Sequence, residues 1–540
     1  MAAGTAPPGT INLIEFTTAL DQSEVQLWPR PSSDPNEPLN WSAWRKALNF
    51  GLATAMTIAA FTLVTVQTVF WQQISIDLDL TIPQLSNGNS VQLAGLATGC
   101  IFFVPFAVKY GRRPVYVVSI IVLAAVTWWT ARMNTYTEVI LTNLFTGLAG
   151  AVNETTVQMT ISDLFFVHQR ARANACYFVA VMIGSFLTPM AAGAQAAAQG
   201  WRWSYYALAI AFTVLTFVYV FAFEETKYIR TVPTHSNSAR KNSVEEAADG
   251  ARTVSSPVPD QDKKDDMIEA DLRHIGSHTM GEVNPIPNSY AKRMRLSTPT
   301  HEPLWKLTTA PLSVLAFPHV LFTALQFASG ISWLVLMLTS TSVIFSAPPY
   351  NFTTQGVGNM SLGPLIGNIF GALYGGPVSD WSIKRFARRN GGVFEPEMRL
   401  WIVMPPTLFM AGGLCMFGVT AGQGMHWIYP SIGGAFFAFG LGSYGDIAFT
   451  LVIDTYRDLV AESFVLVAFF RNAFSICVPV ALTPWMTAMG VGYMYVTAGC
   501  ISLFIGLLHI PLIIYGKRIR VALAPRYDHV VESVRDFAKR

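Results

Sequence analysis

Residues 91–132 read VQLAGLATGCIFFVPFAVKYGRRPVYVVSIIVLAAVTWWTAR. The apolar runs 91–110 and 114–132 stand on either side of a short basic turn at Gly111. About 20 apolar residues is the length that a helix needs to cross roughly 30 Å of hydrocarbon at 1.5 Å per residue. The stretch therefore predicts two membrane-spanning helices joined by a tight turn.

The composition of the whole chain agrees with a membrane protein. Of 540 residues, 52% are hydrophobic and only 13% are charged, against roughly 25% charged in a soluble domain. The net charge of +3 and the 36 basic residues exclude a polyanionic or nucleic-acid partner. The five cysteines are scattered through apolar stretches, which indicates neither a disulfide framework nor a metal site. The polar first 45 residues contain no cleavable signal peptide pattern.

Scanning outward from residues 91–132 predicts an all-α membrane protein with twelve transmembrane helices. The predicted spans are 47–71, 91–110, 114–132, 137–162, 174–195, 204–223, 312–344, 355–378, 399–420, 427–453, 460–486 and 491–515. The long 312–344 window is compatible with a re-entrant or interfacial start.

A polar stretch, 224–311, separates the sixth span from the seventh. It is rich in Ser, Thr, Pro, Asp and Lys, so it buries too little apolar surface to offset its ordering entropy and is predicted to be a disordered cytoplasmic linker. The predicted organisation is therefore an N-terminal tail (1–46), a six-helix bundle (47–223), the linker (224–311), a second six-helix bundle (312–515) and a C-terminal tail (516–540).

The basic residues predict the orientation in the membrane. If both termini are cytoplasmic, 33 of the 36 Lys and Arg residues lie on the cytoplasmic side and only Arg132 and Arg202 on the other. Arg471 remains inside a span. Because basic residues concentrate in cytoplasmic loops, this distribution predicts twelve spans with both ends inside.

The two halves share features that indicate an internal duplication, as in many secondary transporters. The fourth span carries Glu154 and ends at Asp163, and the tenth carries Asp446 and ends at Asp454. Arg170 follows the fourth span, as a basic residue also follows the tenth. The fifth and eleventh spans each contain a proline near their middle, and the second and eighth spans are each followed by a short basic loop.

The loop KYGRRP (109–114) resembles part of the signature loop of the major facilitator superfamily. In that family a glycine makes the turn and arginines hold a neighbouring helix end, which implies these roles for Gly111, Arg112 and Arg113. The sequence departs from the family pattern at Val104 and Val108, where Gly and Asp are usual. In the second half, the motif GPVSD ending at Asp380 keeps both residues.

Further motifs resemble those of the fungal twelve-span, drug:proton antiporter-like branch, which includes polyamine transporters. The segment GSFLTPMAAG (184–193), with Pro189 and Gly193, resembles the fifth-span motif of the antiporters. The motifs that resemble the branch itself are DPNEPLNWS (34–42), DLFFVHQR (163–170, which ends at Arg170), GWRW (200–203), ETKY (225–228), and ARRNGG (387–392) with EPEMRL (395–400). The resemblance covers nearly the whole chain and implies two bundles that expose a cavity alternately to each side of the membrane.

Three ionisable residues inside spans are the strongest candidates for a substrate or proton pathway: Glu154, Asp446 and Arg471. Their depths, from a rise of about 1.5 Å per residue, allow an Asp446–Arg471 ion pair, which we take as a hypothesis. Glu154 has no basic partner in its own half. In the resembled fold the first, fourth, seventh and tenth spans line the cavity, so Glu154 and Asp446 would both face it. The alternative is that these groups only make hydrogen bonds between helices.

Polar and aromatic residues on the same spans are candidates for lining that cavity. Besides the three charged residues, the candidate pathway residues are Asn143, Gln326 and Trp333. Trp333 could hold a cation through its ring face, and an apolar-aromatic cavity with few polar groups is a usual small-molecule site. Pro189 and Gly193 could bend the fifth span. For each residue, ordinary helix packing is the alternative.

These features predict a proton-coupled secondary transporter in the cell membrane. The expected partners are a small-molecule substrate, protons and the lipid bilayer, with no cofactor or metal. No Gly-x4-Gly-Lys-Ser/Thr loop occurs, which excludes an ATP-driven pump, and no nucleophile elbow or His pair indicates an enzyme. Export of a drug, toxin or metabolite is preferred, while import of polyamines or other organic cations and a non-transporting sensor are the alternatives. Asn351 begins a sequon that could be glycosylated on the outer side.

Overall fold

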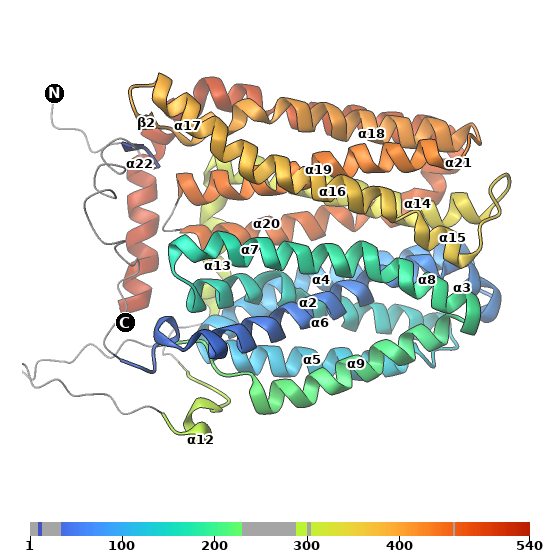
Figure 1. Ribbon diagram of the computed structural model, residues 1–540, viewed down its shortest axis with the longest axis horizontal. Coiled ribbons are helices and arrows are strands. Elements are labelled where there is room, and N and C mark those ends of the chain that lie inside the picture. The colour runs from blue at the N-terminus through green and yellow to red at the C-terminus, as the bar shows by residue number, and fades with distance from the viewer. Residues whose placement is uncertain (1–8, 13–33, 229–287, 300–303, 457–458, 540) are drawn as a thin grey trace, which may run out of the picture.

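The computed structural model describes residues 9–12, 34–228, 288–299, 304–456 and 459–539 (Figure 1). Most of these residues are helical, and the long helices lie side by side along one axis. We call the left end in Figure 1 the basic end, because the basic loops 109–113 and 384–399 lie there. The other end, which carries α3 and α15, is the opposite end.

The N-terminal half fills the lower part of Figure 1. Its elements are η1 (Pro38–Asn40), α2 (Ala43–Val69), α3 (Trp71–Leu78), α4 (Ile82–Tyr110), α5 (Arg112–Thr130), α6 (Tyr136–Leu164), α7 (Val167–Met182), the π-helix η2 (Ile183–Leu187), α8 (Thr188–Gln199) and α9 (Trp201–Ala222). The elements α7, η2 and α8 follow one another without a break and form one span.

The C-terminal half fills the upper part of Figure 1. Its elements are α13 (Leu304–Ser313), η3 (Val314–Ala316), α14 (Pro318–Ser346), α15 (Thr354–Asn359), α16 (Leu362–Leu373), the π-helix η4 (Tyr374–Val378), α17 (Ser379–Arg389), η5 (Pro396–Ile402), α18 (Met404–Gly422), α19 (Ile428–Thr455), α20 (Val460–Ser475), α21 (Cys477–Leu507) and α22 (His509–Lys539). Helix α21 contains one non-helical residue, Gly490, with φ of 78°.

Local sequence fixes where the helices of the N-terminal half begin and end. Thr135 caps α6, because its hydroxyl accepts from the Glu138 backbone N–H at 3.3 Å and the Glu138 carboxylate accepts from the Thr135 N–H at 3.1 Å. Gly111 ends α4 and starts α5 with φ of 112°, a conformation that side chains rarely adopt. The predicted tight turn between the spans 91–110 and 114–132 is therefore confirmed.

Nine helices in the described part of the chain are long and apolar enough to cross a membrane. Eight correspond to single predicted spans, and the ninth, Glu462–Ser533, contains the last two. Two predicted spans fall outside this set, although helices occupy them. In α6 the polar residues Asn143, Asn153 and Glu154 reduce the mean hydropathy. In the run from α16 to α17, Gly and Pro residues reduce it. The chain is thus a helical protein with several membrane-spanning helices.

The predicted linker and tails are more structured than expected where the structure describes them. Residues 288–299 include helix α12 (Tyr290–Arg293), and α13 precedes the seventh predicted span, so these parts of the 224–311 segment differ from the predicted disorder. The remaining linker residues, 229–287 and 300–303, lie outside the described residues. Residues 516–539 of the predicted tail 516–540 are part of α22, which crosses the basic end in Figure 1.

At the basic end, α22 and the N-terminal residues cover the C-terminal half. Strand β1 (Ile11–Asn12) pairs antiparallel with β2 (Val393–Phe394). From α22, Tyr527, Val530 and Val531 pack in one apolar cluster with Phe317 and Tyr456. Their spacing puts these three side chains on one face of the helix. This packing explains why α22 continues beyond the last predicted span.

Glycines allow the closest helix contacts within each half. A Cβ on Gly147 of α6 would lie 1.9 Å from the backbone oxygen of Gln92 on α4, and a Cβ on Gly367 of α16 would lie 1.9 Å from that of Ala435 on α19. Small residues at such positions let membrane helices approach each other closely. The two halves therefore use the same packing device between corresponding helices.

We expect Gly147→Ala to destabilise the protein, because the new methyl group forces α4 and α6 apart. Overpacking of this kind costs about 1–3 kcal/mol. Thermal unfolding of the purified protein in detergent measures the effect. Gly51→Ala in α2 is the matched control, since nothing lies within 4 Å of a Cβ there, and it should be neutral or slightly stabilising. Equal melting temperatures for the two variants would contradict this description of the contact.

Candidate functional site

The central polar feature of the bundle is an ion pair between its two halves. Arg471 of α20 contacts the Glu154 carboxylate of α6 through its guanidinium, and the two side chains are 16% and 8% exposed. Glu154 lies 10 residues before the end of α6, and Arg471 lies 11 residues after the start of α20. At about 1.5 Å per residue, both are roughly 15 Å from the basic end. The pair therefore joins the halves near mid-depth.

Two further side chains complete the surroundings of the Glu154 carboxylate. The amide of Asn472 donates to Glu154 Oε2 at 2.6 Å, and the Cys100 thiol of α4 lies 3.9 Å from the same oxygen. Sequence reasoning missed both residues, although Asn472 directly follows Arg471. Around them, α4, α6 and α20 form an apolar cluster of Leu93, Leu96, Cys100, Ala151 and Ala468. Charges enclosed in this way are costly to leave unpaired.

The hypothesis of an Asp446–Arg471 pair is wrong. Arg471 on α20 faces the N-terminal half and binds Glu154 instead. Asp446 on α19 lies against η4, where a Cβ on Gly375 would meet its side chain at 2.8 Å. No ion pair or side-chain hydrogen bond of the Asp446 carboxylate occurs among the described residues. Residue counting predicted similar depths for Asp446 and Arg471, but depth does not determine the direction in which a helix points its side chains.

The other predicted pathway residues are buried but do not join the ion pair. Asn143 lies between α6 and α4, where its Nδ2 would be 2.9 Å from a Cβ on Gly88. The Nδ2 atom of Asn143 and the Oε1 atom of Gln326 are buried without a hydrogen-bond partner in the described structure. The indole N–H of Trp333 donates to Ser329 Oγ at 2.9 Å on its own helix. Asn143, Gln326 and Trp333 therefore stay candidates for the substrate pathway, but no contact joins them to the Glu154–Arg471 pair in the described structure.

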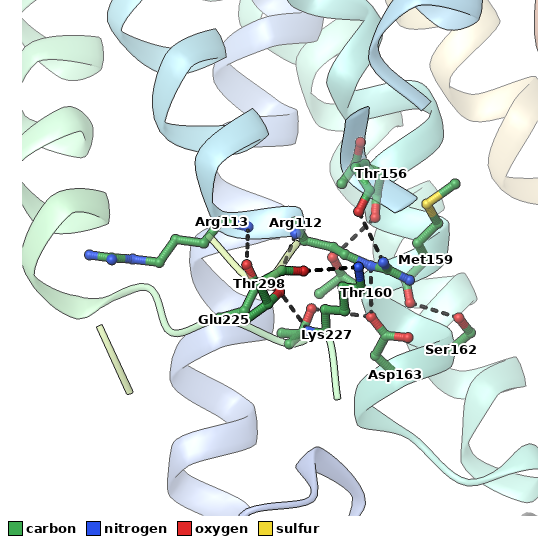
Figure 2. A network of polar contacts seen from close by, with 12 residues as sticks. Arg112, Arg113, Thr156, Met159, Thr160, Ser162, Asp163, Glu225, Lys227 and Thr298 are labelled. Carbon is green, nitrogen blue, oxygen red and sulfur yellow. Dashed lines mark hydrogen bonds and ion pairs between the residues drawn. The ribbon is translucent and has the colours of Figure 1, made fainter. Parts of the chain in front are cut away.

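A second network of charges lies at the basic end of the N-terminal half (Figure 2). The predicted residues Arg112 and Asp163 form an ion pair of 3.0 Å. Glu225, just after α9, accepts from the backbone N–H groups of Arg112 at 2.9 Å and Arg113 at 3.2 Å. A Cβ on Gly111 would lie within 3 Å of the Glu225 carboxylate. Glycine is therefore required here both for the turn and for this close approach.

Burial and hydrogen bonding act on Glu225 in opposite directions. Burial raises the pKa of Glu225 above its ordinary value, while hydrogen bonds from the Lys227 and Arg112 backbone N–H groups partly offset that increase. Arg113 is also buried, and its guanidinium donates to the carbonyl oxygens of Phe223 at 2.9 Å and Val220 at 2.7 Å. The loop and the end of α9 are thus held together. The sequence identifies Glu225 only as the first residue of the ETKY motif. Its position just after the sixth span was the signal that it could hold the loop 109–113 at the end of α9.

The C-terminal half has a comparable network at the basic end. Arg399 binds Asp454 at the end of α19 at 2.7 Å and lies 3.5 Å from the predicted residue Asp380. The Arg112–Asp163 and Arg399–Asp454 pairs each join a basic-end segment to the last turn of the fourth predicted span of a half, α6 in the first half and α19 in the second. This correspondence supports the duplication inferred from the sequence.

The remaining predicted residues lie at separate places. Arg170 donates to the carbonyl oxygens of Phe165 and Ser162 at the end of α6, at 3.1 and 2.9 Å. Pro189 is the second residue of α8, which directly follows η2. A Cβ on Gly193 would lie 2.9 Å from the Thr354 carbonyl oxygen, so α8 and α15 approach closely across the halves. The sequon residue Asn351 is exposed at the opposite end.

Side chains of the two halves also meet nearer each end of the bundle. Phe178 of α7 contacts Phe449 of α19, with ring centroids 5.9 Å apart, and Phe449 contacts Phe464 of α20 at 4.8 Å. Phe464 precedes Arg471 by seven residues, about 10 Å nearer the basic end. Toward the opposite end, a cavity of only about 20 Å³ remains between α2, α14 and α16, about the space of one water molecule.

Sequence comparison with known proteins shows the family to which the chain belongs. The family model described as Major Facilitator Superfamily matches residues 51–479. An uncharacterised MFS-type transporter of Schizosaccharomyces pombe is 29% identical over 96% of this chain and 94% of its own length. Protein HOL1 of Saccharomyces cerevisiae is 28% identical over 95% of each chain. The major facilitator superfamily multidrug transporter FLU1 of Candida albicans is 25% identical over 90% of this chain and 74% of its own length. The chain therefore belongs to the major facilitator superfamily of membrane transporters.

Proposed function

We propose that the protein is a secondary transporter that exports small organic molecules in exchange for protons. The observation that carries this proposal is the buried Glu154–Arg471 pair, which joins the two halves near mid-depth. A transporter of this kind alternates between states in which the halves separate toward one side or the other. A contact that both halves share, and that depends on charge, is suited to control that separation.

The chemistry of the pair explains how protons or a substrate would act on it. Protonation of Glu154 removes the negative charge that holds Arg471, and a cationic group bound to the carboxylate competes with Arg471 for that charge. Breaking a buried ion pair without such compensation costs about 3–5 kcal/mol. Protonation or cation binding therefore lowers the free energy needed to separate the halves, which couples ligand binding to the conformational change.

The topology expected for such a transporter is twelve spans with both termini in the cytoplasm of the cell. Among the residues that the structure describes, nine helices qualify by length and hydropathy. One of them divides at Gly490, and α6 and the continuous run from α16 to α17 are long enough to add two more. The 33 basic residues that this topology puts on one side support the orientation. The cell membrane is the proposed location.

A second candidate function is the import of polyamines or other organic cations. The observation that favours it is the Asp446 carboxylate, which adds a negative charge to the C-terminal half without a basic partner among the described residues. The name of the relative FLU1, a multidrug transporter, supports export instead. We give export the preference, because the same carboxylates also serve proton exchange.

Expression in cells lacking their own pumps separates the two functions. The export proposal predicts increased resistance to lipophilic compounds, and no increase in uptake of labelled spermidine. Glu154→Gln should remove that resistance, whereas Glu138→Gln, which changes a carboxylate in the first turn of α6, far from the ion pair, should retain it. Spermidine uptake that Glu154→Gln abolishes, with resistance unchanged, would contradict export. The absence of both activities in correctly folded protein would favour a non-transporting sensor.

A further inference from the structure

The docked part of the central linker, residues 288–299, carries an exposed surface that none of the transport chemistry uses. It reads NSYAKRMRLSTP, with three basic residues and no acidic one. Arg293 lies 3.7 Å from Glu224. Lys292 and Arg295 are exposed, and neither forms an ion pair within the described residues. The segment thus presents positive charge to its surroundings.

The segment is fixed to the basic end of the N-terminal half. The Tyr290 hydroxyl donates to the Phe221 carbonyl oxygen at 2.6 Å, and the Met294 carbonyl oxygen accepts from Arg113. The Thr298 N–H donates to the Tyr110 carbonyl oxygen at 2.8 Å. Figure 2 shows Thr298 beside the loop of Arg112 and Arg113. The segment is therefore attached to the ends of α4, α5 and α9.

Its apolar side chains continue the lipid-facing surface of α9. Phe221 is 65% exposed on the last turn of α9, and in a membrane-embedded helix such a side chain faces lipid. Tyr290, bonded to that same turn, is 54% exposed, and Leu296 is 58% exposed. In Figure 1, α12 lies directly beyond the basic end of α9. This places Tyr290 and Leu296 at the boundary between hydrocarbon and headgroups.

An aromatic and an aliphatic side chain that flank basic residues at this depth are typical of a membrane-surface segment. Tyrosine prefers the headgroup level, and lysine and arginine attract anionic headgroups there. An acidic soluble protein would match the charge, but it would not explain two apolar side chains exposed beside the lipid-facing turn of α9. The lipid surface satisfies both observations.

We propose that residues 288–299 bind the headgroup of an anionic phospholipid, with Lys292 and Arg295 contacting the phosphate or carboxylate and Tyr290 and Leu296 contacting the acyl region. Because Arg113 and Tyr110 hold the same segment, the bound lipid stabilises the loop 109–113 from outside the protein. This inference rests on the proposed function in one respect: the proposed orientation puts the segment on the cytoplasmic side, where anionic lipids occur. Lipid binding itself does not depend on transport.

Native mass spectrometry of the purified full-length protein, titrated with phosphatidylserine or phosphatidylcholine, tests the proposal. We expect phosphatidylserine to bind in preference to phosphatidylcholine. Lys292→Ala/Arg295→Ala should weaken phosphatidylserine binding at least about tenfold, since each basic residue near an anionic surface contributes severalfold. Arg518→Ala/Arg526→Ala on α22 is the control of equal charge change and should leave the affinity unchanged. Equal affinity of wild type and the Lys292/Arg295 variant would overturn the proposal.

Two further arms distinguish a lipid from a soluble anion. Leu296→Ser should reduce phosphatidylserine binding, and water-soluble glycerophosphoserine should not displace the lipid at equal concentration. If glycerophosphoserine competes equally, the apolar contacts play no part and the membrane-surface assignment is wrong. Melting temperatures show whether each variant is folded. The lipid-binding assay needs no transported substrate, so its failure can be distinguished from failure of the proposed transport function.

Discussion

Arg471→Ala is expected to abolish transport and to destabilise the protein, because it leaves the Glu154 carboxylate buried without its cation. In soluble proteins, removing one partner of a buried ion pair costs about 3–5 kcal/mol. The Glu154 side chain is only 8% exposed, so water cannot fully replace the guanidinium. The Asn472 amide remains as a donor but carries no charge. We therefore expect transport to fall at least about a hundredfold, the factor that roughly 3 kcal/mol represents.

The measurement is efflux from cells, or uptake into inside-out vesicles, normalised to the amount of folded protein, together with the melting temperature. The matched control is Arg202→Ala, which breaks an ion pair with Asp77 at the opposite end. Both of those side chains are partly exposed, and such surface pairs contribute about 0–1 kcal/mol. Transport by Arg471→Ala at the level of the Arg202 variant would show that the pair between the halves has no functional role.

Arg520→Ala is expected to cause the largest loss of stability in the C-terminal half. Arg520 of α22 is fully buried, and its guanidinium donates twice to the Glu397 carboxylate, at 2.8 and 2.7 Å. His319 at the start of α14 lies 3.4 Å from the same carboxylate. Removing the guanidinium leaves a buried anion, which costs about 3–5 kcal/mol. Lys517→Ala, on the same helix but in an exposed pair with Glu395, should cost less than about 1 kcal/mol.

The same contact predicts an acid dependence of stability. Burial raises the pKa of Glu397, but the His319 ring 3.4 Å away and the hydrogen bonds from Arg520 outweigh it and lower the pKa to about 2, from an ordinary value of 4.5. A group with a lowered pKa stabilises the folded state above its unfolded pKa. This contribution should therefore be complete above pH 4.5 and be lost as the pH falls toward 2. Melting temperatures of wild type and Arg520→Ala that stay equally far apart down to pH 2 would contradict it.

The sequence was sufficient to predict the helical membrane fold and the depth of its charges. Apolar length determines which segments can span, and a fixed rise per residue determines how deep Glu154 and Arg471 lie. The direction of each side chain was not predictable. It depends on how α6 and α20 pack across the halves, which is why Arg471 was assigned to Asp446 rather than to Glu154.

The basic end shows a similar division between predictable and unpredictable features. The resemblance of residues 109–114 to the family's signature loop implied the turn at Gly111 and a helix-end contact of Arg112, and the structure shows that Asp163 is the partner in that contact. The role of Glu225 depends on the end of α9 returning beside the loop. In the tail, the spacing of Tyr527, Val530 and Val531 was a readable sign of an amphipathic helix, but only the structure shows that α14 and α19 provide its partner.

The reciprocal exchange of the central charges tests the account most directly. Glu154→Arg and Arg471→Glu should each abolish transport, since each puts two like charges together in a buried site between the halves. The double variant restores an ion pair at the same depth, so it should recover a substantial part of the wild-type transport and melting temperature. A double variant that folds as stably as the wild type but transports no better than either single variant would contradict the account.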